Sequence, residues 1–456
     1  MNGSIVGAKA GPAPVVIRKL AAKPDPKPYS LKIIRMECFN PNKKTIIPFI
    51  PLRKDYLNEV DSIWTDDKPS MAITWGFVGD GRSNKFKIYA KFKFTDSNGN
   101  NVPVKVEASS GGSAAVISNE VTVAREKATS TNKSPVKTNT ASFTFNSYNI
   151  KGFSKQDISF VWKYKDVNGS WVEIKTIPVT VYFIPAKPNL PWMITGKESN
   201  YNSNQNPWTA ALDMLLGWGV EGKTSTTEIS KQITSYVNSS ISLEYDINRG
   251  ASLLTIGDRG QFFDCSTFIS SVGTKQIINC TDCATIVSTF ANLLGANLYQ
   301  VCFGKRDRAG FIGFFCNTIK AIGYEGQWQY PFACDKNGNR VDISNTKDAA
   351  YGTFAYHEIA FAAGKSYNKK IYDACLKVDN NAIKEGNKRG KEVGSLPADI
   401  QFATKNSYAK VLKANDLAYY RELLVLNNVN NLNNSEIVGY GYGINLGDTK
   451  GRRSLK

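Results

Sequence analysis

The hydrophobic pattern of this chain changes near residue 187. Before that point apolar and polar residues alternate, most clearly in Lys85–Phe94, where Phe, Ile and Ala point to one face and lysines to the other. After it, apolar residues recur every three or four positions, as on one face of a helix. Because the two periods need different backbones, the 456 residues should form a strand-built region followed by a region that contains helices.

The first region, residues 30–187, is predicted to be an all-β, antiparallel sandwich of immunoglobulin-like type. Short alternating runs are separated by turn sequences rich in Asp, Asn, Ser and Gly. Helical periodicity is absent from this part of the chain, which favours two packed sheets. The runs expected to be strands, besides Lys85–Phe94, are Val102–Val106, Val116–Val123, Ser142–Phe145, Ile158–Tyr164, Trp171–Ile174 and Pro178–Ile184.

Two segments flank the sandwich. Residues 1–29 are rich in Ala, Pro and Lys and are predicted to be a disordered basic leader. Prolines at positions 185, 188 and 191 mark a stiff connector, so residues 188–204 are assigned as a linker.

Residues 205–456 are predicted to form an α+β domain. Helices are expected to come first, because Pro, Ser and Thr stand where helices start and Gly295 stands where one should end. Strand-like runs follow. The expected helices are Pro207–Trp218, Thr227–Asn238 capped by Ser225 or Thr226, Cys280–Leu294 and Ala414–Leu424, and the expected strands are Gly310–Phe315, Thr353–Phe361 and Lys370–Val378.

The formal net charge is +18, with most of the excess in the front half. This favours an acidic partner for the basic half, although a solvated basic surface explains the charge equally well. No apolar run is long enough for a transmembrane segment, and the N-terminus lacks the apolar stretch of a Sec-type signal peptide. A soluble protein is therefore expected, cytoplasmic before any non-classical export.

The chain has 8 cysteines, too few for a disulfide scaffold in this length, so reduced thiols are expected. Cys280 stands at the predicted start of a helix, where free backbone N–H groups favour a thiolate. Cys280 and Cys283 also form a C-x-x-C, which is typical of redox dithiols and zinc sites. A second Cys pair and a βαβ pattern are both missing, so neither a metal nor a cofactor is expected.

The single histidine, His357, lies in an apolar strand and is either a structural core residue or a base. The turn sequence around Lys365 predicts a hairpin that places His357 opposite Asp373, with Asp379 beyond that register. A carboxylate at this position would orient the imidazole. A thiol, a base and an orienting acid are the parts that thiol acyl transfer needs, which makes Cys280, His357 and Asp373 the candidate catalytic residues.

At these residues the sequence resembles the transglutaminase-like (papain-like thiol) superfamily. Cys280-Thr-Asp-Cys-Ala284 is similar to its Cys-x-Asp-x-Ala signature, and the spacing of His357 and Asp373 is also similar. The resemblance covers roughly residues 205–380. It implies that Cys280 is the nucleophile, His357 the base and acid, and Asp373 the orienting residue, while Asp282 is structural.

The resulting hypothesis is a cysteine hydrolase or acyltransferase that acts on a protein or peptide amide: a peptidase, an amidase or deamidase, or a transglutaminase. The basic sandwich would find the target, and the leader suggests an exported effector or toxin. The alternative is a non-catalytic binding or structural protein with a vestigial site. Lys384–Lys391 and Gly451–Arg453 are expected to be solvated loops, and nucleic acid is not expected as a partner.

Overall fold

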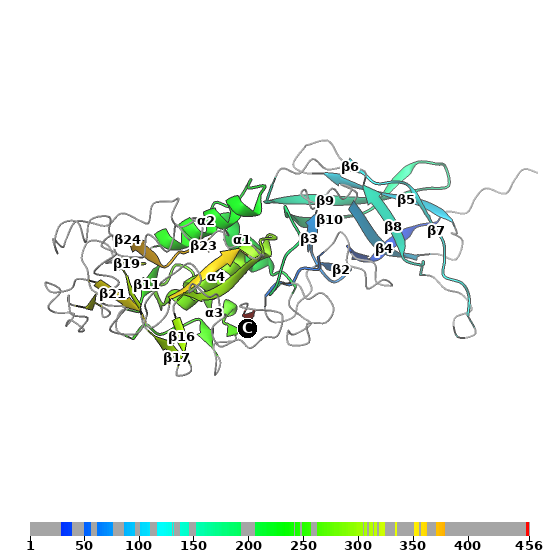
Figure 1. Cartoon of the computed structure of the whole chain (residues 1–456). Coiled ribbons are helices and arrows are strands. Elements are labelled where there is room, and N and C mark those ends of the chain that lie inside the picture. The colour runs from blue at the N-terminus through cyan, green and yellow to red at the C-terminus, as the bar shows by residue number, and fades with distance from the viewer. Residues whose placement is uncertain are drawn as a thin grey trace, which may run out of the picture.

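The computed structural model is mostly β-sheet with few helices (Figure 1). It describes residues 29–38, 50–55, 62–75, 86–95, 101–109, 116–129, 131, 137–145, 152–192, 206–240, 242–246, 249–256, 262–303, 305–307, 310–312, 314–316, 319–323, 333–334, 351–354, 357–362, 371–378 and 453–455. Figure 1 separates a sheet-rich end, called the sandwich below, from the region after residue 206, called the C-terminal region.

Two sheets build the sandwich. The first has the order β2-β1-β4-β8, and the second has the order β3-β10-β9-β5-β6 with β7 also paired to β5. The strands of the first sheet are β1 (Leu31–Glu37), β2 (Ile63–Thr65), β4 (Phe86–Phe94) and β8 (Ala141–Phe145). Those of the second are β3 (Met71–Trp75), β5 (Val102–Ser109), β6 (Val116–Ile117), β7 (Val121–Val123), β9 (Ser154–Lys165) and β10 (Trp171–Phe183).

The core between the two sheets follows the alternation seen in the sequence. In β4, Ile88 and Phe92 are buried while Lys87 and Lys93 are exposed. The rings of Phe92 and Phe143 meet Trp162 of the opposite sheet edge to face, at centroid distances of 5.5 and 4.9 Å. Edge-to-face contact is a favoured arrangement for buried aromatic rings. Apolar residues at every second position therefore form the core between the two sheets.

The sandwich is not antiparallel throughout. β3 runs parallel to β10, with Met71 opposite Val179. Almost the whole sandwich separates these two strands in sequence, so no tight turn forces them to be antiparallel. Trp171–Phe183 is also one strand with an irregularity between Glu173 and Lys175, where the sequence suggested two.

Four helices are described in the C-terminal region: α1 (Thr209–Gly217), α2 (Thr226–Ser239), α3 (Cys265–Ser270) and α4 (Cys280–Leu293). Ser225 caps α2 through a capping box with Glu228, one of the two predicted caps. Gly295 follows α4 with φ +92°, and a Cβ there would lie 2.4 Å from the Ala186 side chain. Glycine is needed at this helix end for both reasons.

Short strands surround these helices, and the predicted order of helices before strands is only partly right. Strands β11, β12, β13 and β14 lie between α2 and α4 in the chain. The strands are β11 (Leu243–Tyr245), β12 (Thr255–Ile256), β13 (Phe262–Phe263), β14 (Gln276–Ile278), β15 (Leu298–Phe303), β16 (Lys305–Asp307), β17 (Gly310–Ile312), β18 (Phe314–Cys316), β19 (Ile319–Ala321), β20 (Ala333–Cys334), β21 (Tyr351–Phe354), β22 (His357–Ala362), β23 (Ile371–Tyr372), β24 (Leu376–Val378) and β25 (Ser454–Leu455). Their sheets are β11-β14, β12-β13-β25, β15-β22-β23, β16-β17, β18-β21-β20 and β19-β24.

The sandwich and the C-terminal region are joined by backbone contacts. The N–H of Phe153 donates to the carbonyl of Lys223 at 2.9 Å, and that of Gly222 donates to Phe153 at 2.7 Å. The first part of the predicted linker is packed as well: Trp192 is fully buried, and its Nε1 donates to the carbonyl of Thr289 in α4 at 2.7 Å.

Some expectations fall outside the described residues. They include the leader up to residue 28, the linker from residue 193, the helix at Ala414–Leu424 and the loop at Lys384–Lys391. The export hypothesis, which rests on the leader, stays a prediction. Within the described part of the chain, no helix combines the length and the apolar character needed to cross a membrane.

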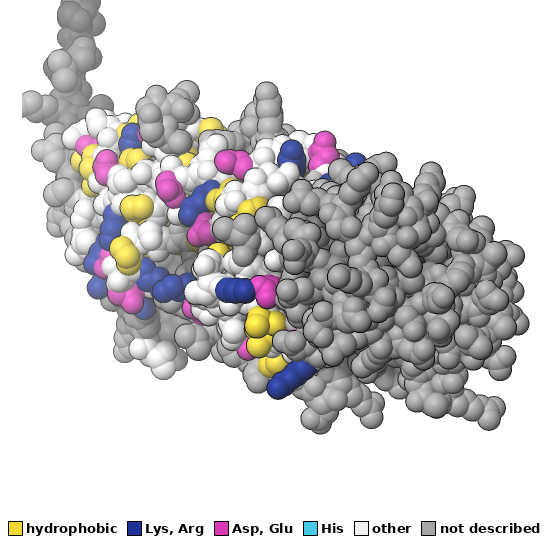
Figure 2. Space-filling model, turned by 90° about the vertical axis from the view of Figure 1, so that its left-hand side faces the viewer, with side chains coloured by type: hydrophobic (Ala, Val, Ile, Leu, Met, Phe, Trp, Pro, Cys, Tyr) yellow, Lys and Arg dark blue, Asp and Glu magenta, His cyan; other side chains and the backbone are white. Residues whose placement is uncertain are grey.

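Many surface charges of the sandwich are paired. Glu107 lies between Lys105 and Lys163, at 2.8 and 2.6 Å, and Lys32 contacts Asp66 at 2.5 Å. Figure 2 views the molecule from the end of the C-terminal region, and on this face too Lys and Arg side chains are interleaved with Asp and Glu. An acidic partner of the basic half stays a prediction.

Candidate active site

Cys280 is the first residue of α4, where the sequence analysis predicted it. The helix begins there because Asn279 accepts from the Asp282 N–H at 3.0 Å, while the Asp282 side chain accepts from the Asn279 N–H at 3.4 Å. This capping box satisfies two backbone donors that a helix start otherwise leaves without partners. Every residue of α4 is buried, and Cys280 is 3% exposed.

Asp282 supports the segment in front of α4. Its carboxylate accepts from the N–H groups of Leu253 at 2.8 Å and Thr255 at 2.9 Å, and from the Thr255 hydroxyl at 2.8 Å. Burial raises the pKa of Asp282 despite these hydrogen bonds. The side chain therefore ties two chain segments together, consistent with the structural role expected for it.

His357 is the first residue of β22, the middle strand of the sheet β15-β22-β23. Its backbone lies opposite Phe303 of β15, and the side chain is 0% exposed. Figure 1 shows β22 lying along α4, so the strand that carries the imidazole packs on the helix that carries the thiol.

Asp373 follows β23 directly and binds the imidazole. His357 Nε2 lies 2.9 Å from Asp373 Oδ2, and Asp373 Oδ1 accepts from the Cys375 N–H at 2.8 Å. The two predicted strands pair in antiparallel fashion, but β22 meets β23 through Ala360 and Tyr372. This register differs from the predicted one by two residues, which keeps both side chains on the same face, because side-chain direction repeats every two residues.

Cys280 is close enough to influence the imidazole. Burial lowers the pKa of His357, but the charge of Asp373, its hydrogen bond to the ring and the neighbouring Cys280 outweigh burial and raise the pKa to about 10. Nε2 is bound to the carboxylate, so Nδ1 is the ring nitrogen that Asp373 does not engage. The structure thus brings together all three residues that the sequence analysis selected.

Two further thiols lie beside this group. Cys283 and Cys375 are neighbours that influence each other's titration. Cys375 has the largest influence on Cys283 and lowers its pKa, but burial and the nearby charges of Asp282, Asp373 and Cys280 together outweigh it and raise that pKa. Burial raises the pKa of Cys375 well above its usual range. Both are therefore neutral thiols near pH 7, as packed cysteines are.

The tail around Arg453, which was expected to be a solvated loop, is a buried part of the C-terminal region. Arg453 is 0% exposed and donates to Glu358, which is 1% exposed. The sequence analysis missed both residues. Glu358 could have been recognised, because it places a carboxylate inside the otherwise apolar run His357–Ala362. Charged residues are rarely buried without a partner, so such a position indicates a buried ion pair. Nothing near Arg453 in sequence indicated that partner.

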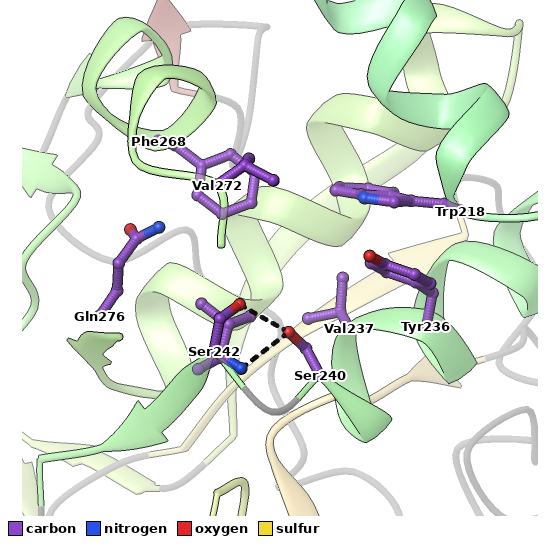
Figure 3. Close-up of a pocket in the computed structure, with 9 residues that line it drawn as sticks. Trp218, Tyr236, Val237, Ser240, Ser242, Phe268, Val272 and Gln276 are labelled. Atoms are coloured by element: carbon purple, nitrogen blue, oxygen red, sulfur yellow. Dashed lines mark hydrogen bonds between the residues drawn. The ribbon is translucent and has the colours of Figure 1, made fainter. Parts of the chain in front are cut away.

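A pocket opens beside α4, away from Cys280 (Figure 3). Its wall includes Trp218 stacked on Tyr236, with ring centroids 5.1 Å apart. The Gln276 amide faces the same space, and Phe268 and Val272 of the α3 segment border it. The Trp218 ring rests on Phe290, 4.8 Å away. Phe290 lies about 15 Å along the helix from Cys280, so this pocket does not lie over the thiol.

No group of three His, Cys, Asp or Glu residues in the described part of the chain is arranged to hold a metal ion.

No protein-family model matches the chain. No curated protein matches its sequence either. Comparison with solved structures finds a transglutaminase. The structure of red sea bream transglutaminase is similar with a TM-score of 0.34 and 10% sequence identity, over 80% of this chain and 65% of that protein. The match thus spans less than two thirds of the transglutaminase.

Proposed function

We propose that this chain is a thiol acyl-transfer enzyme that acts on amide bonds of proteins or peptides. Cys280 is the nucleophile, His357 is the base and then the acid, and Asp373 orients the imidazole. One observation carries the proposal: the single histidine is fully buried, with Nε2 on Asp373 at 2.9 Å and with the thiol that begins α4 close enough to influence the ring. This arrangement supplies the three groups that thiol catalysis needs.

The first half of the reaction uses the thiol and the imidazole together. His357 takes the proton of Cys280, and the thiolate attacks the carbonyl carbon, so that a C–S bond forms and the carbonyl electrons move to oxygen. When the carbonyl reforms, the C–N bond breaks and the imidazolium gives its proton to the leaving amine. The raised pKa of His357, about 10, suits the imidazole to hold the proton that it takes from Cys280 until the leaving amine receives it.

The second half releases the acyl group from the thioester. If water attacks with His357 as base, the product is a carboxylic acid, and the enzyme is a peptidase or, on a glutamine side chain, a deamidase. If an amine attacks, a new amide forms and the enzyme is a transglutaminase. Asp373 holds the ring in one orientation throughout, because its other oxygen is bound to the Cys375 N–H.

A second candidate is a binding or structural protein with a vestigial site. The observation that favours it is the burial of Cys280, which is only 3% exposed. A substrate carbonyl must reach Sγ for catalysis, whereas a packing thiol needs no access.

A pH series of iodoacetamide labelling with peptide mapping separates the two. In an enzyme, Cys280 labels about tenfold or more faster than Cys38 at pH 7, and His357→Gln removes that advantage. The matched control is Asp213→Asn, which changes an exposed carboxylate of α1 that is bound to Lys155 and Tyr182 and not to the three candidate residues. Equal rates for Cys280 and Cys38 in the wild-type chain would sink the enzymatic proposal and favour the binding protein.

A further inference from the structure

The last described residues return to the start of α4. Ser454 and Leu455 form β25, which pairs in parallel with Phe262 and Phe263 of β13. β13 pairs with β12, whose first residue, Thr255, is bound to Asp282. The C-terminal strand is thus connected through two neighbouring strands to the helix that begins with Cys280, and Figure 1 shows the C-terminus beside α3.

Arg453, just before β25, makes a forked contact in the interior. Its Nη1 donates to Glu358 Oε1 at 2.5 Å and to Thr285 Oγ1 at 2.8 Å, and its Nη2 donates to Glu358 Oε2 at 3.1 Å. A guanidinium held by two parallel hydrogen bonds has a defined plane and position. Arg453 therefore links β22 to α4.

Glu358 extends this link to the residues that carry the chemistry. Its Oε2 also accepts from the Thr281 hydroxyl at 3.1 Å. Thr281 follows Cys280, and Glu358 follows His357. The network of Arg453, Glu358 and Thr281 thus joins the two chain segments one residue away from the thiol and from the imidazole.

Stability alone does not explain such a pair. Removing two charges from water costs free energy, and apolar residues of similar volume often replace a buried ion pair with no loss of stability. Directional hydrogen bonds instead fix the distance and angle between the elements they join. A thiol and an imidazole that must exchange a proton depend on that distance.

We propose that Arg453 and Glu358 are positioning residues that hold β22 against the start of α4, so that Cys280 stays beside His357. Neither residue contacts the reacting atoms in the proposed mechanism. The inference about geometry stands on the network itself, and its catalytic consequence rests on the proposed function.

The test uses the full chain with Glu358→Met and Arg453→Met combined, which leaves the net charge unchanged. The first readout is the iodoacetamide labelling rate of Cys280, which should fall about tenfold or more, as expected when a reacting pair is misplaced. The second is an NMR pH titration of the imidazole in protein labelled at histidine, which needs no assignment because the chain has 1 His. Its midpoint should fall below about 10, because the contribution of Cys280 is lost while the larger contribution of Asp373 remains.

The matched control is Glu107→Met with Lys163→Met, which removes an ion pair of the sandwich and should change neither readout. Arg453→Lys keeps the charge but loses the fork, so an intermediate labelling rate is expected.

A double variant that keeps both the wild-type labelling rate and the wild-type titration overturns the proposal. Loss of the fold in that variant, measured by circular dichroism, also overturns it, because the pair would then be a stabilising element. If wild-type Cys280 labels no faster than Cys38, the proposed enzyme fails, but the histidine titration still decides whether the network positions His357.

Discussion

Ion pairs of the sandwich and of the C-terminal region differ in their exposure to water. In the sandwich, Lys163 and Glu107 form an ion pair with side-chain exposures of 28% and 16%, around an apolar core. In the C-terminal region, Arg453 and Glu358 form one with exposures of 0% and 0%. Water screens the first pair and not the second. The charges of the first pair therefore stay hydrated, whereas those of the second are held by hydrogen bonds between buried groups.

The pKa values of Glu107 in the sandwich and His357 in the C-terminal region are shifted in opposite directions. Burial raises the pKa of Glu107, but the hydrogen bonds and charges of Lys105 and Lys163 outweigh it and the pKa is lowered. The pKa of His357 is raised to about 10. The two regions should lose stability at opposite ends of the pH scale.

The largest expected effect comes from breaking one charge pair in each region. Arg453→Met leaves the Glu358 carboxylate buried without its cation, which should cost about 3–5 kcal/mol of unfolding free energy. Lys163→Met, in the sandwich, should cost at most about 1 kcal/mol because solvent reaches that pair. Urea unfolding of both variants measures the difference, and equal costs would contradict the contrast between the regions.

The next effect is the pH dependence of stability. A raised folded-state pKa means that the contribution of His357 is complete below its unfolded pKa of 6.5 and is lost as pH rises toward about 10. The loss should be at most on the order of 5 kcal/mol. Asp373→Asn should flatten this alkaline decline in urea unfolding, since the carboxylate that raises the pKa is gone.

Glu107→Gln is the counterpart in the sandwich. A lowered folded-state pKa gives stability that is present above the unfolded pKa and is lost as pH falls through the folded one. Glu107→Gln should therefore reduce only the loss of stability at acidic pH.

For the histidine prediction, the contradicting outcome is an Asp373→Asn chain that loses stability at high pH as steeply as the wild type. That result would show that the pair of Asp373 and His357 does not cause the alkaline loss of stability.

The smallest effect compares two helix caps. Asn279→Ala at α4 and Ser225→Ala at α2 each remove the side-chain half of a capping box and should each cost about 1 kcal/mol of unfolding free energy. Their effect on Cys280 should differ, because only Asn279 caps the helix that begins with the thiol. Labelling of Cys280 should slow in Asn279→Ala and stay unchanged in Ser225→Ala. Equal labelling rates in the two variants would mean that the cap does not position the thiol.

Local patterns predicted much of the secondary structure. The alternation in β4, the cap of α2 and the start of α4 are visible within a few positions of the chain, because pleat and helix periods act over short distances. The short helix α3 was missed, since six residues carry too little periodicity to be recognised. Strand β3 was missed too, and its parallel partner lies far away in sequence.

The candidate site shows the same division. Cys280 was found from a helix start and His357 from being the single histidine, both local signals. The register of β22 and β23 differed by two residues, because turn sequences indicate a hairpin without specifying its pairing. Asp373 was still the right partner for His357, because a register shift of two residues leaves both side chains on the same face of the sheet.

By itself, the sequence determined several strands of the sandwich, such as β4, β5 and β9, where α2 and α4 begin, and which thiol begins α4. These properties depend on contacts between residues close in the chain. Only the tertiary structure decided that Arg453 pairs with Glu358 and that Asp373 meets His357 through Nε2. A buried charge requires a partner, but which partner it finds depends on how distant segments pack, and no local pattern specifies that.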